Sequence, residues 1–383
     1  MSKKTIIISC GGTGGHIFPG TEIARSLLEK DPSLNILFIG ALGKMEMKRI
    51  PNEGFSIIGL WIQGIHRNSI LKNIFFPFKL IISLIQAICI LLYMKPVLVI
   101  RTGGFASGPI LFIASCLRMK TYIQEQNCLP GLTNKILAKY VSKIFVAYNQ
   151  MEKFFPEHKI LNFGNPVRKF LKTNSVSHKE SIEFFGLKEN MFTILVVGGS
   201  LGSTSINSLI FDIINRVDLN CELDLNDCQW IWQTGELDFD KYQFQLNKSN
   251  INSTNLSVHK FINRMDLAYH ASDVVVSRSG AIAICEISYL AKHSILIPSP
   301  YVADNHQEIN AQYLESQKAC IKILERSNPN FKGIDRKSFC SAVIDLKTDK
   351  SKRDKIGQKA NKLFKYNASK EIVNEIYSDI ENK

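Results

Sequence analysis

The chain has 383 residues, of which 45% are hydrophobic and 21% charged, with a formal net charge of +13. This composition excludes a disordered chain, and the length exceeds the roughly 250–300 residues at which single cores stop growing, so we expect two domains. The positive charge favours anionic partners. The basic residues are scattered rather than clustered, which argues against a nucleic-acid-binding protein.

Nine cysteines are spread along the chain without a C-x-x-C pair. This spacing argues against a disulfide framework and a zinc ribbon, and it is typical of a reducing cytoplasm. The start MSKKTIIISC resembles a lipoprotein signal only superficially, because its apolar run is shorter than the roughly seven to fifteen residues that export needs. We therefore expect a cytoplasmic protein.

Short apolar, β-branched runs alternate with longer helical patterns along the chain. This alternation predicts an α/β fold with parallel sheets covered by helices on both faces. The predicted strands are residues 5–9, 36–39, 97–100, 121–124, 144–147, 160–163, 193–197, 229–233, 273–276 and 294–297.

Two of these strands open with the same pattern, an apolar run that ends in a glycine-rich loop. They are TIIISCGGTGGH (5–16) and TILVVGGSLGS (193–203), so we predict two Rossmann-like, doubly wound domains. Between them, Gly164 and Pro166 precede a polar stretch, which places the domain boundary after residue 164. Open α/β sheets bind ligands at the carboxyl ends of their strands, so we expect the ligand in a cleft between the domains.

The apolar stretch IFFPFKLIISLIQAICILLYM (74–94) is tested as a membrane span. Pro77 and Lys79 interrupt it, and residues 80–94 are fewer than the roughly 20 that a spanning helix needs. Lys79, Ser83 and Gln86 form one narrow polar stripe, which is typical of a helix largely buried in a protein. We predict a core helix in preference to a membrane span.

The start of this stretch and the residues before it combine cations with apolar side chains. The cations are Arg67, Lys72 and Lys79, and the apolar neighbours include Ile74, Phe75 and Phe78. Apolar anchors surrounded by cations bind the surface of an anionic bilayer. The alternative is that these residues pack inside the N-terminal domain, and the pattern does not choose between the two.

Four glycine-rich turns follow predicted strands, in residues 8–20, 101–109, 196–203 and 277–281. The first is not a dinucleotide fingerprint, because Ile17 stands where the third glycine belongs, and no P-loop lysine follows it. A backbone without Cβ atoms can bring its N–H groups and a helix N-terminus against phosphate or sugar oxygens. All four turns map to the same edge of their sheets, which predicts a ligand with phosphate and sugar groups.

Polar side chains near these turns have functional and structural interpretations. Glu286, in the second turn of a helix after Gly280, could accept hydrogen bonds from ribose hydroxyls or simply face solvent. The run Gln124, Glu125, Gln126 and Asn127 suits sugar recognition, or it could satisfy its own loop backbone.

His16 stands at the end of the first glycine loop. An imidazole titrates near neutral pH, so His16 could remove a proton from an acceptor hydroxyl. Alternatively, it could orient the diphosphate or the sugar of the acceptor.

Together these motifs resemble the MurG family, the bacterial glycosyltransferases that add N-acetylglucosamine (GlcNAc) from UDP-GlcNAc to lipid I. The similarity covers almost the whole chain. The matching motifs are GGTGGHIFPG (11–20), GGFASGP (103–109), EQN (125–127), GLTNK (131–135), GNPVR (164–168), GGSLG (198–202), SRSGA (277–281) and HQEINA (306–311).

The resemblance implies a GT-B fold with three parts. Residues 1–164 would hold lipid I and associate with the membrane, residues 165–367 would bind UDP-GlcNAc, and a last helix within 368–383 would pack back on the first domain. It also implies an inverting transfer to the C4 hydroxyl of N-acetylmuramic acid (MurNAc) in lipid I. This transfer forms lipid II with a β-1,4 bond and releases UDP, for peptidoglycan synthesis.

The resemblance also implies cofactor and partner expectations. No D-x-D of the metal-dependent kind sits at the glycine-rich loops, so we expect no metal and no other cofactor. The expected partners are UDP-GlcNAc, lipid I, the anionic cytoplasmic face of the plasma membrane and other cell-wall assembly proteins.

By motif position, the resemblance assigns roles to individual residues. The implied catalytic residues are His16 and Asn127. The implied donor-binding residues are Thr13, Gly14, Gly15, Asn127, Arg168, Ser200, Ile262 (through its backbone, to uracil), Ser279, Gly280, Glu286, Gln307 and Asn310. The implied acceptor-binding residues are Gly14, His16, Gly104, Ser107, Glu125 and Asn134. The implied membrane-contacting residues are Lys72, Ile74, Phe75, Phe78 and Lys79.

Three positions depart from the family pattern. Gln124 stands where many members have histidine, Leu201 where glutamine is common, and Ala283 where some carry threonine. The first change bears on hydrogen bonding at the acceptor side, and the last removes a hydroxyl contact to the donor phosphate.

Two rival functions share the expected architecture. A nucleotide-sugar sensor would not require His16 or the Asn127 loop. A UDP-GlcNAc 2-epimerase has no lipid acceptor and would not need the apolar and basic surface of residues 67–82.

Overall fold

The computed structural model describes residues 4–65, 71–168, 171, 176–199, 201–215, 228–249, 253–328 and 331–381. Arg67 and Ser200 lie outside these residues. The chain divides into two compact units, Met1–Arg168 with Lys365–Lys383, and Lys169–Phe364. The boundaries therefore fall after residues 168 and 364, where the sequence analysis places them after 164 and 367.

The first unit is built on a parallel sheet of seven strands in the order β3-β2-β1-β4-β5-β6-β7. The strands are β1 (Thr5–Ser9), β2 (Asn35–Ala41), β3 (Ser56–Leu60), β4 (Leu98–Arg101), β5 (Lys120–Glu125), β6 (Lys143–Val146) and β7 (Ile160–Asn162). The helices are α1 (Gly14–Lys30), α2 (Glu46–Asn52), η1 (Leu71–Asn73), α3 (Phe76–Met94), α4 (Ser107–Cys116), α5 (Leu132–Leu137), η2 (Met151–Lys153), η3 (Glu157–Lys159) and α15 (Ala368–Glu381).

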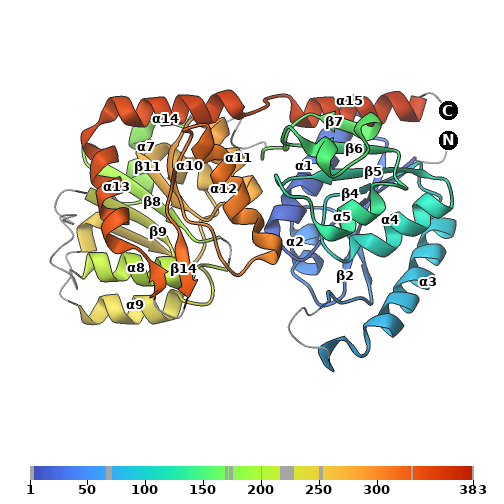
Figure 1. The fold of residues 1–383 in the computed structure, drawn as a ribbon, viewed down its shortest axis with the longest axis horizontal. Helices are drawn as coiled ribbons and strands as arrows, with labels where there is room; N and C mark the ends of the chain where they lie inside the picture. Colours follow the sequence, from blue (N-terminus) through green and yellow to red (C-terminus); the bar gives the residue numbers. More distant parts are fainter. Residues whose placement is uncertain are drawn as a thin grey trace. The chain divides into compact units, whose positions relative to one another are not determined.

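Successive residues of these strands point to opposite faces of the sheet, and each face has its own apolar core. In β1, Ile7 packs into the core covered by α3, α4 and α5, whereas Ile6 and Ile8 pack into the core covered by α1 and α15. The second core includes Ile372 and Ile376 of α15, which lies along α1 (Figure 1). A continuous isoleucine run is therefore buried on both sides, as a central parallel strand requires.

The second unit contains a parallel sheet of six strands in the order β10-β9-β8-β11-β12-β13, and an antiparallel hairpin of β14 and β15. The strands are β8 (Phe192–Val197), β9 (Cys228–Gln233), β10 (Leu256–His259), β11 (Val274–Ser277), β12 (His293–Leu296), β13 (Ile321–Lys322), β14 (Glu325–Asn328) and β15 (Phe331–Ile334). The helices are α7 (His178–Phe184), α8 (Thr204–Ile214), α9 (Phe239–Lys248), η4 (Ser253–Asn255), α10 (Met265–Ala271), α11 (Ala281–Tyr289), η5 (Ala303–Asn305), α12 (His306–Ser316), α13 (Arg336–Thr348) and α14 (Lys350–Leu363).

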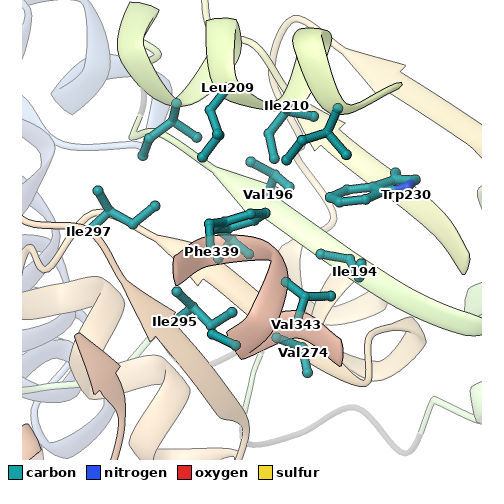
Figure 2. Packing of buried hydrophobic residues seen from close by; sticks show 14 of the residues in the cluster. Ile194, Val196, Leu209, Ile210, Trp230, Val274, Ile295, Ile297, Phe339 and Val343 are labelled. Atoms are coloured by element: carbon teal, nitrogen blue, oxygen red, sulfur yellow. The ribbon is translucent and has the colours of Figure 1, made fainter. Parts of the chain in front are cut away.

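One face of this second sheet forms a large apolar core. Figure 2 shows Ile210 of α8 and Phe339 of α13 packed against Val196 and Ile295 of the strands. Residues of this face recur at every second position of a strand, as in Ile194 and Val196. The core holds α8 and α13 against this face of the sheet.

The strand order reverses at one point in each sheet. In the first unit this point lies between β1 and β4, and in the second between β8 and β11. Loops that leave neighbouring strands at such a switch point diverge and leave room for a ligand. All four glycine-rich turns follow one of these four strands, so the topology gives each unit one candidate half-site.

Helix α3 is mostly exposed, so the prediction of a largely buried helix is wrong. It is the one described helix long and apolar enough to cross a membrane, and 17% of its 18-residue apolar window is buried. Its buried residues are Ser83, Ala87 and Leu91, so part of the polar stripe faces the protein and apolar residues such as Ile81 and Leu92 are exposed. A polar stripe predicts the solvent-facing side of a helix, but Ser83 can be buried because its hydroxyl donates to the Leu80 carbonyl of the same helix.

Among the described cysteines, Cys340 is disulfide-bonded, which the sequence analysis did not anticipate. The other described cysteines are free thiols. Burial raises the pKa of Cys128 to about 12, so this thiol is neutral near the strand end that carries Asn127.

Candidate functional site

The first half-site begins where β1 ends and α1 starts. Thr13 is the exposed N-cap, and its carbonyl accepts hydrogen bonds from the N–H groups of His16 at 3.1 Å and Ile17 at 3.2 Å. Gly14 and Gly15 form the first turn of α1. A helix N-terminus carries partial positive charge on its N–H groups, so this turn is suited to an anion such as a diphosphate.

The absence of a Cβ atom at the glycines of this loop leaves space for neighbouring groups of the protein. A Cβ atom on Gly11 would lie 2.4 Å from Glu46 Oε1. Gly104 has φ +85°, and its Cβ would lie 2.3 Å from the Gly11 carbonyl oxygen. The loops after β1 and β4 therefore pack backbone against backbone, which only glycine permits. The glycine pattern alone predicts the close approach of a ligand, and the structure shows that a second loop of the protein also needs these glycines.

His16 is partly buried in the first turn of α1, with its ring oriented by the loop. Its Nδ1 lies 2.9 Å from the Gly11 carbonyl oxygen. A carbonyl oxygen can only accept, so in the neutral ring Nδ1 carries the proton and Nε2 is the basic nitrogen. Thr102 Oγ1 donates to the His16 carbonyl at 2.7 Å, which ties the loop after β4 to α1.

The loop after β5 is held by a buried network beneath Asn127. Glu125 is 2% exposed and accepts hydrogen bonds from the Asn127 N–H at 3.0 Å and from Asn134 Nδ2 at 2.7 Å. Asn134 Oδ1 in turn accepts from Arg101 Nε at 2.5 Å. Burial lowers the pKa of Arg101 to about 10, and the charge of Glu125 opposes that shift. Glu125 and Asn134 thus hold the loop from its buried side, whereas Asn127 is partly exposed.

The glutamines near the end of β5 form hydrogen bonds with other groups of the first unit, as the alternative interpretation predicts. Gln124 and Gln126 are buried, and Gln124 Nε2 donates to Asn165 Oδ1 at 2.8 Å. Gln126 Nε2 donates to the Thr102 carbonyl at 2.7 Å. These hydrogen bonds favour the second interpretation, a loop that satisfies its own polar groups, for these two glutamines.

Ser107 and Arg168 also have partners within the first unit. Ser107 is fully buried, and its hydroxyl donates to the Gly104 carbonyl at 2.7 Å, which fixes the turn rather than facing a ligand. The Arg168 guanidinium lies 5.0 Å from the ring centroid of Phe18, over its face. Phe18 is a residue of α1, so Arg168 lies near the first half-site.

The second half-site brings together three predicted donor-binding residues. Ser279 Oγ donates to the Gln307 carbonyl at 2.8 Å, and Asn310 Nδ2 donates to the Ser279 carbonyl at 3.3 Å. Gln307 Oε1 accepts from the Ser299 N–H at 2.9 Å. Gly280 is the N-cap of α11, so the start of this helix lies beside the network. Ser279 and Asn310 are buried, whereas Gln307 is partly exposed.

Glu286 and Ile262 have protein partners in the second unit. Glu286 is 2% exposed and accepts a hydrogen bond from the Tyr269 hydroxyl at 3.2 Å, so it is not a solvent-facing helix residue. The Ile262 N–H donates to Gln233 Oε1 at 2.8 Å. Any ribose or uracil contact at these two positions would have to share or replace these hydrogen bonds.

Arg278 was missed in the sequence analysis, although it stands inside the quoted SRSGA motif. Its guanidinium donates to Ser203 Oγ at 2.6 Å and to the carbonyl of Ile297 at 3.1 Å. Ser203 is the N-cap of α8, directly after the glycine-rich loop that follows β8. Burial lowers the pKa of Arg278, and the charge of Glu325 opposes that shift. Arg278 therefore joins the ends of β8, β11 and β12.

The three apolar residues among the predicted membrane residues form an exposed surface, and the side chain of Lys72 lies outside what the structure describes. Ile74, Phe75 and Phe78 are each more than half exposed. Lys79 Nζ donates to Gln63 Oε1 at 2.7 Å and lies 5.5 Å from the Trp61 ring centroid. These residues thus do not pack inside the first unit, which was the alternative interpretation.

Within the described ranges, no group of three or more His, Cys, Asp or Glu side chains could hold a metal ion.

Comparison with known protein families gives matches in both units. The glycosyltransferase family 28 N-terminal domain matches residues 6–146, and the glycosyltransferase family 28 C-terminal domain matches residues 193–372. A protein of Flavobacterium psychrophilum is 42% identical over 383 residues, covering 100% of both chains. Its name is "UDP-N-acetylglucosamine--N-acetylmuramyl-(pentapeptide) pyrophosphoryl-undecaprenol N-acetylglucosamine transferase".

Two solved structures show the same fold at low sequence identity. The crystal structure of Acinetobacter baumannii MurG is 21% identical, with a TM-score of 0.72 over 98% of this chain and 99% of that one. A UDP-N-acetylglucosamine 2-epimerase is 14% identical, with a TM-score of 0.65 over 100% of this chain and 98% of that one. The two Rossmann-like sheets therefore belong to the GT-B fold class.

Proposed function

The chain belongs to the MurG family of glycosyltransferases, and from that premise we propose that it transfers GlcNAc from UDP-GlcNAc to lipid I. The product is lipid II, with a β-1,4 bond to the C4 hydroxyl of MurNAc, and UDP is released. The observation that carries the proposal is the 42% identity to a transferase of that name along the full length of both chains. The likeness to a 2-epimerase, at 14% identity, supports only the fold.

We assign the donor to the second unit. The helix start at Gly280 and the turn around Ser203 offer N–H groups for the diphosphate. Gln307, which is partly exposed, offers its amide for the GlcNAc hydroxyls, and buried Asn310 would hold the Ser279 carbonyl beside that helix start. Glu286 would accept a hydrogen bond from the ribose, in competition with Tyr269.

We assign the acceptor to the first unit. The N-terminus of α1 at Gly14 and Gly15 is suited to the lipid diphosphate. The Asn127 loop, held by Glu125 and Asn134, provides a rigid edge for the sugar. Glu125, Asn134 and Ser107 would then act by positioning the loops and not by direct contact, because all three are buried.

In the proposed chemistry, the MurNAc O4 attacks the anomeric carbon of GlcNAc. The O4–C1 bond forms while the bond from C1 to the diphosphate oxygen breaks, and the configuration at C1 inverts. The O4 proton passes to His16 Nε2, the nitrogen left basic by the Nδ1 contact to Gly11. The leaving UDP gains negative charge, which helix N-termini and Arg168 would stabilise.

We propose that this chemistry needs no metal ion, since the chain offers helix N-termini and an arginine for the leaving diphosphate. Turnover should be unchanged when EDTA is added. A loss that Mg²⁺ or Mn²⁺ restores would contradict this part of the proposal.

We also propose that the chain sits on the cytoplasmic face of the plasma membrane as a peripheral protein. Exposed Ile74, Phe75 and Phe78 supply apolar anchors, and Lys79 lies beside them. Burial of apolar surface and attraction to anionic lipids add in such a surface.

The central experiment is incubation of the protein with UDP-GlcNAc and a short-chain lipid I analogue. We expect a disaccharide lipid and UDP in equal amounts, with no product when the acceptor is omitted. Formation of a UDP sugar epimer would indicate an epimerase, and binding without either product would indicate a sensor.

A further inference from the structure

We propose that Glu46 is a positioning residue for His16 and acts through the peptide group that joins Gly11 to Gly12. The inference rests on the proposed function, because it concerns how the residue assigned as the base is held. Glu46 is the first residue of α2, and no motif in the sequence marks it.

The geometry places a carboxylate and an imidazole on opposite sides of one peptide. Glu46 Oε2 accepts the Gly12 N–H at 3.0 Å, and the Gly11 carbonyl lies 2.9 Å from His16 Nδ1. A trans peptide is planar and points its N–H and C=O in opposite directions. The Gly11–Gly12 peptide is therefore a rigid connection from Glu46 to the ring.

The carboxylate of Glu46 can influence the protonation of the His16 ring through this peptide. A carboxylate that accepts the Gly12 N–H polarises the amide and makes the Gly11 oxygen a stronger acceptor, since linked hydrogen bonds polarise one another. A stronger acceptor holds the proton on His16 Nδ1 and keeps Nε2 proton-free. A carboxylate bonded directly to a catalytic histidine fixes its tautomer and orientation in the same way.

The surroundings of Glu46 show that it is held in one place. Its side chain is fully buried, and Oε1 accepts the Ala41 N–H at 3.0 Å. Among the described residues, no cation forms an ion pair with it. Burying a carboxylate without a counter-ion is unfavourable unless hydrogen bonds compensate.

Two glycines make the space for this side chain. A Cβ on Gly11 would lie 2.4 Å from Glu46 Oε1, and a Cβ on Gly40 would lie 2.6 Å from Glu46 Cγ. Gly40 belongs to β2, so the loop and the strand both leave room for the same carboxylate. This arrangement places a buried carboxyl group next to the His16 loop.

The first test is Glu46→Gln, which keeps the size of the side chain. One of its two polar atoms becomes an NH₂ donor facing a backbone N–H, so a hydrogen bond is lost. We expect kcat to fall roughly 10- to 100-fold, less than the roughly 10²- to 10⁴-fold that the proton transfer itself contributes, because the base is still present. The KM for UDP-GlcNAc should stay within about twofold, because Glu46 and His16 are assigned to the acceptor side of the reaction and not to donor binding.

A spectroscopic measurement tests the same inference without turnover. In ¹⁵N-histidine-labelled protein, the His16 ring resonances are identified by their loss in His16→Gln. We expect wild type to show Nδ1 protonated and Nε2 unprotonated, and Glu46→Gln to show a mixed tautomer. If wild type makes no disaccharide, the proposed function fails, whereas this measurement still decides the link between Glu46 and His16.

Two further variants complete the test. Glu22→Gln removes another buried carboxylate of the first unit, one that pairs with Arg25 at 2.8 Å, and should leave kcat and the tautomer unchanged. Gly40→Ala displaces Glu46 from the β2 side and should reproduce the Glu46→Gln effects, which matters if Glu46→Gln fails to fold. Unchanged kcat and unchanged His16 resonances in the folded variants would overturn the proposal.

Discussion

Arg278 and Glu325 form a buried ion pair in the second unit, with Nη2 and Oε2 2.6 Å apart. The same guanidinium donates to Ser203, the N-cap of α8. Arg278 therefore connects the β14–β15 hairpin, through Glu325, to the turn assigned to the donor diphosphate. A segment outside the glycine motifs thus takes part in ordering one of them.

Glu325→Gln is predicted to destabilise the second unit and to weaken UDP binding. Removing one member of a buried pair leaves the other charge without compensation, which typically costs about 3–5 kcal/mol. Arg278 keeps its hydrogen bonds to Ser203 and the Ile297 carbonyl, so we expect about 2 kcal/mol. Denaturant unfolding and calorimetric titration with UDP would measure the two effects.

Glu315→Gln is the matched control for that variant. Glu315 pairs with Lys322 at 2.7 Å but its side chain is 42% exposed. An exposed pair contributes about 0–1 kcal/mol, so stability and UDP affinity should stay close to wild type. Equal losses in both variants would show that burial of the Arg278 pair has no special role.

His16→Ala is predicted to lower kcat about 10²- to 10⁴-fold with saturating acceptor, because the proton acceptor is removed. UDP affinity should be unchanged, since the donor is assigned to the second unit. Steady-state kinetics and calorimetry check both statements. Retention of most of kcat would contradict the base role and leave orientation of the acceptor as the function of His16.

Glu286→Gln is predicted to weaken UDP binding about tenfold or more, because a hydrogen bond to a charged acceptor is worth about 1.5–3 kcal/mol. Tyr269→Phe removes only the competing donor at 3.2 Å and should change the dissociation constant by less than about threefold. Titration with UDP and with uridine-free diphosphate separates ribose contacts from phosphate contacts. Equal UDP affinity of Glu286→Gln and wild type would remove Glu286 from the donor site.

The double variant Phe75→Ser with Phe78→Ser is predicted to reduce binding to vesicles that contain anionic phospholipid. Both rings are more than half exposed, and each apolar side chain contributes to partition into the bilayer surface. Leu237→Ser, at another exposed apolar residue, is the control in the second unit. Vesicle co-sedimentation at low and high salt measures the effect, and equal binding of all three proteins would contradict the peripheral assignment.

Lys292→Met is predicted to change how stability depends on pH. Burial lowers the pKa of Lys292 from 10.5 to about 8, and Asp273 opposes the shift. Below pH 8 both folded and unfolded chains hold the proton, so the cost of burying the charge is fully present. Between about 8 and 10.5 only the unfolded chain holds it, so the cost disappears as pH rises.

Lys292→Met should therefore stabilise the protein more at pH 7 than near pH 10.5. Its free energy of unfolding, relative to wild type at the same pH, should be about 2–3 kcal/mol larger at pH 7. Comparing the two pH values removes the constant contribution of the lost hydrogen bond to the Ser272 carbonyl. Urea unfolding at both values provides the measurement. A difference that does not change with pH would contradict the lowered pKa.

The central strands could be predicted because burial on both faces leaves a continuous apolar signal, as in Ile6, Ile7 and Ile8 of β1. Edge strands lack that signal. β3 (Ser56–Leu60) alternates exposed and partly buried residues and contains Gly59, and no strand was predicted there. The β14–β15 hairpin was missed for a similar reason, since charged residues such as Glu325 and Arg326 interrupt its pattern.

The candidate site was predictable where function is carried by backbone, and unpredictable where it depends on contacts distant in sequence. Glycine-rich turns after strands are visible in a single sequence, because φ above zero and close approach both select glycine. Glu46 contacts Gly12 across 34 positions, and nothing in the local sequence indicates that contact. The sequence leaves both interpretations open for Gln124 and Gln126, because their partners, such as Asn165 and the Thr102 carbonyl, come from other loops.

The position of α15 has a consequence for biosynthesis. Ile372 and Ile376 complete the core around Ile6 and Ile8, yet they follow the entire second unit in the chain. Helix α1 covers part of this face as soon as it is made, but the part that α15 covers stays open until the last helix emerges from the ribosome. Nascent chains stalled before residue 368 should therefore expose that part of the face to chaperones.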